Sequence, residues 1–283
     1  MTDDDRKPRD EEIDVWGLTH VGSVRKDNQD HYLLASLHKR LEILSTSVPK
    51  ETLLSQSDER IAFLAMVADG VGGRAHGEEA SRTALEQATR YLTQSIKTCS
   101  QGDAQTDEFI DLLQAAALKS HESVLARAAE SGESRGMATT LTLWFGVWPW
   151  YYLLQVGDSR YYLYRDATLT QITRDQTMAQ DLVDQGVLKR SDLARSPLSN
   201  VLSSAIGSQH TLPVVTRIEA AWENVHLLCS DGLTKHVSDE AITARLANMT
   251  SSRECCEQLL QDALDGGGTD NITIIVGRAI RQD

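Results

Sequence analysis

Residues 61–70 read IAFLAMVADG, an apolar run that ends in the pair Asp69 and Gly70. The same order recurs in residues 225–232, VHLLCSDG, which end in Asp231 and a glycine. Short apolar runs bounded by turn residues are typical of strands buried in a core. Acids that follow such strands lie at the mouth of the core, where we expect carboxylates from distant parts of the chain to converge.

Two more acids stand at strand ends, Asp158 after YYLLQVG and Asp270 before NITIIV. A single Asp-Gly pair is most often a plain turn. To explain this sequence, the turn alternative would have to hold for several such pairs at once. Two carboxylates about 4 Å apart repel by about 4 kcal/mol at an effective dielectric constant near 20. A converged cluster therefore requires a cation, or some of its acids must stay protonated.

The residue types indicate which cation would bind and which anion it would attract. No His or Cys cluster at metal-ligand spacing accompanies the acids, and oxygen ligands alone favour Mg²⁺ or Mn²⁺ over zinc. Gly70 is a candidate backbone ligand, because a residue without Cβ lets its carbonyl approach an ion closely. Arg25, in RKDNQD, can hold phosphate oxygens beside such a site. A surface ion pair of Arg25 with Asp27 or Asp30 remains an open alternative.

Short strand-like segments dominate the chain and predict a large, mostly antiparallel β system. They cover residues 13–22, 31–36, 61–68, 139–147, 150–157, 160–165, 168–173, 213–220, 225–230 and 271–280. The stretch 137–156 is long and apolar enough to suggest a membrane helix, but Gly146 and Pro149 interrupt it. We predict two strands joined at the WPW turn, and no membrane association.

Two helical blocks, residues 78–97 and 107–130, are expected to pack on a sheet face. In the first, small and apolar residues recur every four positions, at Ala80, Ala84, Ala88, Leu92 and Ile96. A third helix begins at Ser251, with Glu254 in capping-box spacing. It ends at the glycines of residues 266–268, and both of its cysteines are predicted to be core or flank residues.

Composition excludes several classes of protein. The chain has 283 residues, with 41 acidic and 28 basic side chains and a formal net charge of −13. This charge argues against a general electrostatic affinity for nucleic acid or anionic lipid. The four cysteines show no CxxC spacing, which argues against zinc and against a disulfide framework. A reduced, cytoplasmic setting fits.

One large domain is predicted for residues 13–283. Residues 1–12 are charged throughout and lack the apolar segment of a secretory signal, so we predict a flexible, acidic, solvated tail there. Residues 37–60 are polar and poorly patterned, which predicts a long loop or insertion.

Seven motifs in chain order resemble those of the metal-dependent protein phosphatases, also called PPM or protein phosphatase type 2C, and are similar to the short bacterial members. They are VRKDNQD, VADGVGG, GMATTLT, VGDSRYYLY, LTQITRDQT, LLCSDGL and GGGTDNITIIV. The resemblance covers about residues 16–278. It implies an α+β fold, a four-layer αββα sandwich in which two mostly antiparallel sheets are flanked by helices.

The resemblance also implies a metal centre of two Mn²⁺ or Mg²⁺ ions with a third ion nearby. Asp69 would bridge the two ions, and Asp231 and Asp270 would complete the shell of the first. Gly70 would offer its carbonyl to the second ion. Asp158 would hold the third.

The implied activity is hydrolysis of phosphoserine and phosphothreonine in proteins, by in-line attack of a metal-activated water. Asp69, Asp231 and Asp30 would be the catalytic residues, with Asp30 acting through water, and Arg25 would bind the substrate phosphate. The expected partners are phosphoprotein substrates, a serine/threonine kinase and its targets among them. The alternative is a catalytically weak pseudophosphatase that serves as a binding or regulatory module. Such a module should have broken metal ligands, and here the matching residues are all present.

The chain departs from the family pattern at several points. Gln29 stands where many members have a Glu that contacts the second ion, so water would contribute more there. Val71 stands where some members have a His proposed as proton donor, which leaves the acid for the leaving group unassigned. The segment between Asp30 and Asp69 looks longer than usual. Residues 178–204 match the family's flap beside the site, and we expect them to affect substrate choice.

Overall fold

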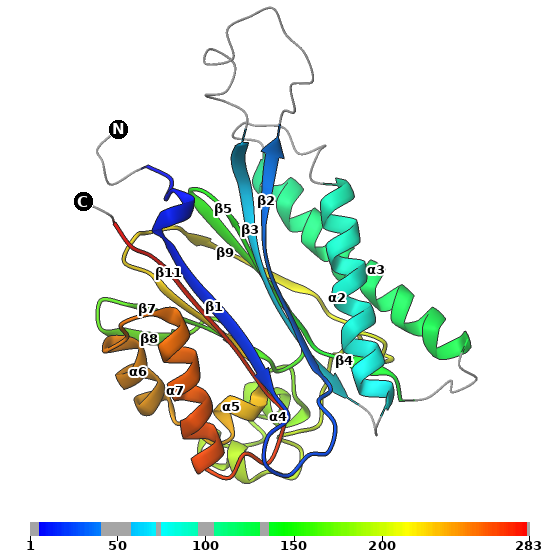
Figure 1. Cartoon of the computed structure of the whole chain (residues 1–283). Coiled ribbons are helices and arrows are strands. Elements are labelled where there is room, and N and C mark those ends of the chain that lie inside the picture. Colours follow the sequence, from blue (N-terminus) through cyan, green and yellow to red (C-terminus); the bar gives the residue numbers. More distant parts are fainter. Residues whose placement is uncertain (1–5, 41–57, 72–74, 96–104, 131–135, 282–283) are drawn as a thin grey trace, which may run out of the picture.

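The computed structural model describes residues 6–40, 58–71, 75–95, 105–130 and 136–281. Within these residues, two antiparallel sheets pack face to face and helices cover both outer faces (Figure 1). The predicted four-layer αββα sandwich is thereby confirmed.

Both sheets contain strands from distant parts of the chain. The five-stranded sheet has the spatial order β1 (Ile13–His20), β11 (Ile272–Ala279), β10 (Val225–Cys229), β7 (Arg160–Arg165) and β8 (Thr168–Gln171). The six-stranded sheet has the order β2 (Asp30–Arg40), β3 (Asp58–Val71), β5 (Leu141–Val147), β6 (Trp150–Val156) and β9 (Val214–Glu219), and β4 (Ala138–Thr139) pairs with the end of β3. Each predicted strand segment is confirmed.

Helices α2 (Ala75–Ser95) and α3 (Gln105–Glu130) cover the six-stranded sheet, and α6 (Asp239–Ala247) and α7 (Ser252–Asp265) cover the five-stranded sheet (Figure 1). Two short helices, α4 (Met178–Asp184) and α5 (Asp231–Thr234), and 3-10 turns at Asp10–Glu12 and Arg190–Arg195 complete the described helical elements. The four-residue repeat is fully buried on α2 at Ala80, Ala84, Ala88 and Leu92. Ile96 lies outside the described residues.

Strand β3 shows how the sequence positions the acids. Leu64 and Met66 pack toward the helices, whereas Ala65 and Val67 belong to the core between the two sheets. Because side chains alternate along a strand, Asp69 continues the face of Ala65 and Val67. The carboxylate therefore lies at the edge of the space between the sheets.

The apolar stretch 137–156 forms a hairpin, in which β5 and β6 pair from Leu141 with Val156 to Val147 with Trp150. This confirms two strands joined at the WPW turn. Among the described helices, none combines the length and the apolar character that crossing a bilayer requires.

The predicted flexible tail over residues 1–12 is wrong for residues 6–12, which pack against the sandwich. Glu12 is 1% exposed, Ile280 donates its backbone N–H to the Glu12 carbonyl at 2.7 Å, and the Trp222 indole donates to the Arg6 carbonyl at 3.2 Å. A charged segment can pack in this way when each buried charge has a partner. Residues 1–5 lie outside the described residues.

The predicted loop over residues 37–60 is also wrong at both ends. Strands β2 and β3 stay paired as far as Arg40 and Asp58, with a register shift at residues 37 and 38. Their outer parts carry charged residues, so the sequence lacks the apolar alternation that would predict a strand. The rest of the prediction, residues 41–57, lies outside the described residues.

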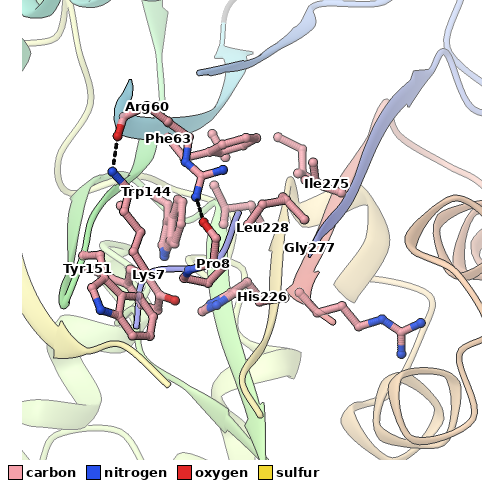
Figure 2. Close-up of a pocket in the computed structure, with 17 residues that line it drawn as sticks. Lys7, Pro8, Arg60, Phe63, Trp144, Tyr151, His226, Leu228, Ile275 and Gly277 are labelled. Atoms are coloured by element: carbon pink, nitrogen blue, oxygen red, sulfur yellow. Dashed lines mark hydrogen bonds between the residues drawn. The ribbon is translucent and has the colours of Figure 1, made fainter. Parts of the chain in front are cut away.

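A cavity of about 80 Å³ lies between the sheets at the end far from Asp69. Its walls include Trp144, Tyr151 and His226, and Lys7 and Pro8 lie beside them (Figure 2). The N-terminal segment therefore covers the end of the sandwich that does not carry the acid cluster.

Candidate metal centre

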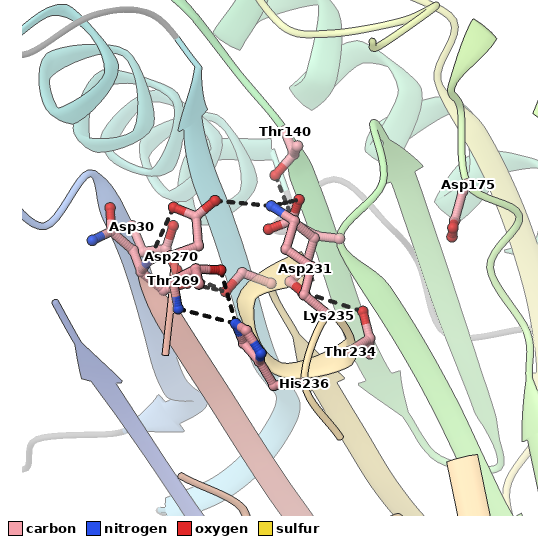
Figure 3. Close-up of polar contacts among 12 residues, drawn as sticks. Asp30, Thr140, Asp175, Asp231, Thr234, Lys235, His236, Thr269 and Asp270 are labelled. Atoms are coloured by element: carbon pink, nitrogen blue, oxygen red, sulfur yellow. Dashed lines mark hydrogen bonds and ion pairs between the residues drawn. The ribbon is translucent and has the colours of Figure 1, made fainter. Parts of the chain in front are cut away.

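The acid cluster forms because several strands end at the same edge of the sandwich. Asp30 and Asp69 are direct register partners at the ends of β2 and β3. In the opposite sheet, β10 ends where β11 begins, so Asp231 and Asp270 flank one another across that pair. Figure 3 shows Asp30, Asp231 and Asp270 around one region, with Asp175 farther away. The predicted convergence of strand-end acids is thus observed.

Asp30 and Asp69 lie in the most buried part of the cluster. Burial raises the pKa of Asp30 to about 6, although hydroxyl groups of Ser230 and Thr273 donate to its Oδ2 at 2.7 and 2.8 Å. Burial also raises the pKa of Asp69 well above its ordinary value, and the charges of Asp30 and Asp231 raise it further. Like charges that face one another across a strand pair are destabilising without a counter-ion.

Asp158 extends the cluster on the side of β6 and β7. Burial raises the pKa of Asp158 to about 8, with further contributions from the charges of Asp231 and Asp175. Asp175 is itself held by Arg160, whose guanidinium donates to it at 2.7 and 2.9 Å. Asp158 therefore belongs to the cluster. Arg160, the arginine of the same GDSR motif, forms its ion pair with Asp175 and does not neutralise Asp158.

Asp231 and Asp270 are the acids with cationic partners. The Lys235 ammonium lies 2.6 Å from Asp231 Oδ2 and 2.8 Å from Asp270 Oδ2. Arg25 binds Asp270 from another direction, at 2.8 Å from Nε to Oδ1 and 3.0 Å from Nη2 to Oδ2. Burial lowers the pKa of Lys235, but the two carboxylates outweigh it and raise the pKa overall. Lys235 is therefore charged at neutral pH.

The donor set fits a hard divalent cation. Oδ1 of Asp30 and Oδ1 of Asp231 are buried and have no hydrogen-bond partner among the described residues. Together with the raised pKa values of Asp30, Asp69 and Asp158, this leaves negative charge that the described side chains do not fully neutralise. In the described part of the chain, no three His, Cys, Asp or Glu side chains form a ready-made metal cage. An ion would therefore draw the carboxylates closer.

Gly70 has a packing role at this edge. A Cβ at position 70 would lie 2.2 Å from the Gly77 carbonyl oxygen, at the start of α2, and 2.8 Å from the Gln29 carbonyl oxygen. The Gly70 N–H donates to that Gln29 carbonyl at 3.2 Å. The close approach of β3 to α2 therefore requires glycine at position 70. This requirement is independent of any metal ion that the Gly70 carbonyl would bind.

The predicted flap begins next to Asp158. Gln176 accepts a hydrogen bond from the Gly157 N–H at 2.8 Å and donates its own backbone N–H to the Gly157 carbonyl at 3.1 Å. Thr177 caps α4, and Met178 donates to the Val201 carbonyl at 2.8 Å, which closes the segment on itself. Residues 178–204 therefore form a compact extension anchored beside the cluster.

The chain matches the protein phosphatase 2C family model over residues 51–265. The chain belongs to the protein phosphatase 2C family. It is 35% identical to the serine/threonine protein phosphatase PstP of Mycobacterium tuberculosis over 222 residues, which are 78% of this chain and 41% of that protein. It therefore spans about two fifths of the length of PstP. The serine/threonine phosphatase Stp of Listeria welshimeri is 29% identical over 214 residues, 75% of this chain and 83% of that protein.

Solved structures of the family agree with the fold. The crystal structure of M. tuberculosis PstP matches with a TM-score of 0.77 at 30% identity, covering 95% of this chain and 99% of that one. The PstP catalytic domain in complex with two manganese ions matches with a TM-score of 0.74, also at 30% identity, and covers the same shares.

Several polar residues of this protein phosphatase 2C site were not predicted from the sequence. Asn271 accepts from the Gln29 N–H at 2.8 Å and donates to the carbonyls of Val21 and Asp27 at 2.9 and 3.0 Å, which fixes the loop that carries Arg25. Ser230 and Thr273 orient Asp30. Ser230 and Asn271 are adjacent to Asp231 and Asp270, and Thr273 lies three positions after Asp270, so proximity to the predicted acids was the available signal.

Proposed function

We propose that the chain is a serine/threonine protein phosphatase that hydrolyses phosphoserine and phosphothreonine with the help of Mn²⁺ or Mg²⁺. In this proposal Asp69, Gly70, Asp231 and Asp270 hold two ions, and Asp158 holds a third. The observation that carries it is the gathering of buried carboxylates at one edge of the sandwich, where burial and mutual repulsion raise their pKa values. The names of PstP and Stp, and the two manganese ions in the PstP catalytic domain, support it.

In this proposal, the residues around the cluster have different roles in the reaction. When bound, the ions supply a water of lowered pKa and positive charge for phosphoryl transfer. Arg25 is 53% exposed, so its guanidinium can turn from Asp270 to phosphate oxygens of a substrate. Asp30 is fixed by Ser230 and Thr273 through Oδ2, and its Oδ1 remains available to orient a water.

Phosphoproteins are the proposed substrates, with a serine/threonine kinase and its targets as the proposed partners. A phosphorylated side chain on a protein surface can reach a site at the edge of the sandwich. We also propose a cytoplasmic setting, since Cys229, Cys255 and Cys256 are buried free thiols, which fits a reducing compartment.

Hydrolysis of p-nitrophenyl phosphate with Mn²⁺, with and without a chelator, tests the proposal. We expect turnover that requires the metal, and release of phosphate from phosphoserine and phosphothreonine peptides. Asp231→Asn should lower kcat/KM by about 100-fold or more, because even partners outside the first metal shell contribute 10- to 100-fold. Asp166→Asn, on an 82% exposed turn residue, is the matched control.

Two results would contradict this function, and a third would contradict the placement of the first ion. A rate that is unaffected by the chelator would remove the metal from the reaction. A folded protein that binds Mn²⁺ but hydrolyses neither the ester nor the peptides would instead support a binding module. Full activity of Asp231→Asn would show that the first ion is not held where we propose.

A further inference from the structure

Lys235 lies at the centre of the acid pair assigned to the first ion. It follows the four-residue helix α5, whose first residue is Asp231. The spacing of four residues turns the lysine back over the start of its own helix. There its ammonium contacts Asp231 and Asp270 together, at 2.6 and 2.8 Å (Figure 3).

Among the described cations, Lys235 is the one that bridges these two acids. Arg25 forms its ion pair with Asp270 and interacts with Asp231 through space. Both oxygens of Asp270 already have partners: Oδ1 accepts from Arg25 Nε and from the Asn271 N–H, and Oδ2 accepts from Arg25 Nη2 and from Lys235. Lys235 also contacts Asp231 Oδ2, so an ion held by both acids would have to bind at oxygens that the ammonium occupies or directly beside them.

An ammonium and a divalent ion cannot share these oxygens without strong repulsion. Mg²⁺ lies about 2.1 Å from its oxygen ligands, so an ion on Asp231 Oδ2 would stand within about 5 Å of the Lys235 nitrogen. Repulsion between a double and a single positive charge at that separation is large even at the dielectric constant of a protein surface. Either the lysine leaves or the ion binds weakly.

We propose that Lys235 is a tethered cation that competes with the first metal ion for Asp231 and Asp270. This inference rests on the metal-dependent function proposed above and deepens it. The lysine side chain is 28% exposed, so it borders solvent and has a route outward when an ion arrives. Lys235 thereby stabilises the acid pair when no ion is bound and raises the metal concentration that the site needs.

Calorimetric titration of the full chain with Mn²⁺ tests the proposal without measuring activity. We expect Lys235→Met, which keeps the length of the side chain and removes its charge, to bind Mn²⁺ at least tenfold more tightly than the unmodified protein. Lys235→Arg keeps the charge and should stay within a few-fold of the unmodified protein. Lys119→Met is the matched control, since Lys119 pairs with the exposed Glu122 on α3.

Thermal unfolding supplies a second readout. Without metal, Lys235→Met should unfold at a lower temperature than the unmodified protein, because Asp231 and Asp270 then repel each other unshielded. Saturating Mn²⁺ should raise its unfolding temperature by a larger step than that of the unmodified protein. If Lys235→Met does not fold, Lys235→Gln replaces it in both measurements.

The outcomes separate this inference from the proposed function. Equal Mn²⁺ affinity of the unmodified protein and Lys235→Met, together with loss of binding in Asp231→Asn, would overturn the competition and leave the metal site standing. Weaker binding by Lys235→Met would also overturn it. Absence of Mn²⁺ binding in every variant would overturn both. Tighter binding by Lys235→Met and by Lys235→Gln, but not by Lys235→Arg, is the expected result.

Discussion

At the scale of single residues, Asp270 illustrates how the site balances its charges. Its carboxylate accepts hydrogen bonds from Arg25 on one side and from Lys235 on the other. Burial alone would raise the pKa of Asp270, but these two cations outweigh burial and lower the pKa. For Asp69, burial and the charges of Asp30 and Asp231 dominate, and its pKa is raised. The cations thus neutralise Asp231 and Asp270 in part, whereas the charge of Asp69 is opposed mainly by burial and by neighbouring acids.

Arg25→Ala should weaken substrate use and change metal binding little. Loss of a charged hydrogen-bonding fork to phosphate is expected to lower kcat/KM by about 10- to 100-fold, mainly through KM. The ion pair between Arg25 and Asp270 is half exposed and screened by solvent. Its removal should therefore lower the Mn²⁺ dissociation constant by about fivefold at most, which means slightly tighter binding. Steady-state kinetics and calorimetry measure the two effects.

Arg165→Ala is the matched control for this substitution, because Arg165 is 51% exposed and pairs with Asp166 far from the cluster. A fall in kcat with KM unchanged would contradict a role of Arg25 in substrate binding. A loss of Mn²⁺ affinity in Arg25→Ala would show that the arginine organises the metal site instead.

At the scale of elements, the sequence predicted what depends on local pattern. The four-residue repeat predicted the buried face of α2, and the Ser251 cap predicted where α7 begins. Short helices without a pattern of their own were not predicted, α5 among them, because tertiary contacts and not propensity hold four residues in a helical turn. Lys235 follows this helix, which is why its contact with Asp270 was not predicted.

The N-terminus of α7 offers a test of this local code. Ser251 accepts a hydrogen bond from the Glu254 N–H at 3.2 Å, so Ser251→Ala should lower the free energy of unfolding by about 1 kcal/mol. Ser251→Asp retains an acceptor and should unfold like the unmodified protein. Urea unfolding measures both variants, and an equal loss in the two would show that the hydroxyl serves packing and not capping.

At the scale of the whole molecule, the two ends of the sandwich differ in structure. One edge gathers the acids from both sheets. The opposite end is closed by residues 6–12, where Arg60 bonds to the Pro8 carbonyl and to Asp10, and Arg6 stacks on Trp222 at 4.7 Å. Strand β1 separates these ends by about 25 Å at about 3.3 Å per residue. The sequence did not predict this closure, because its charges find partners only after folding.

Glu12 is the central charge of this closure. Arg6 donates to its two carboxylate oxygens at 2.6 and 2.7 Å, and Arg9 donates at 2.7 Å from its backbone and 2.9 Å from its side chain. The hydrogen bonds from Arg6, and next those from Arg9, hold the pKa of Glu12 well below its usual range. A carboxyl group with a lowered pKa in the folded state stabilises the fold above its ordinary pKa, and this contribution is lost as the pH falls.

Glu12→Gln should therefore lower Tm by several degrees at pH 7, because it removes the shared partner of two arginines. The difference from the unmodified protein should shrink as the pH is lowered below about 4.5, the ordinary pKa of Glu, where the unfolded chain takes up a proton that the folded chain resists. Glu11→Gln, a neighbouring substitution at a 54% exposed residue, should change Tm little at either pH. The Mn²⁺ dissociation constant should be the same in all three proteins, since the acid cluster lies at the other end of the sandwich. A Glu12→Gln protein whose Tm deficit stays constant down to about pH 3, well below the ordinary pKa of Glu, would show that shape and not charge makes residue 12 important for closing this end.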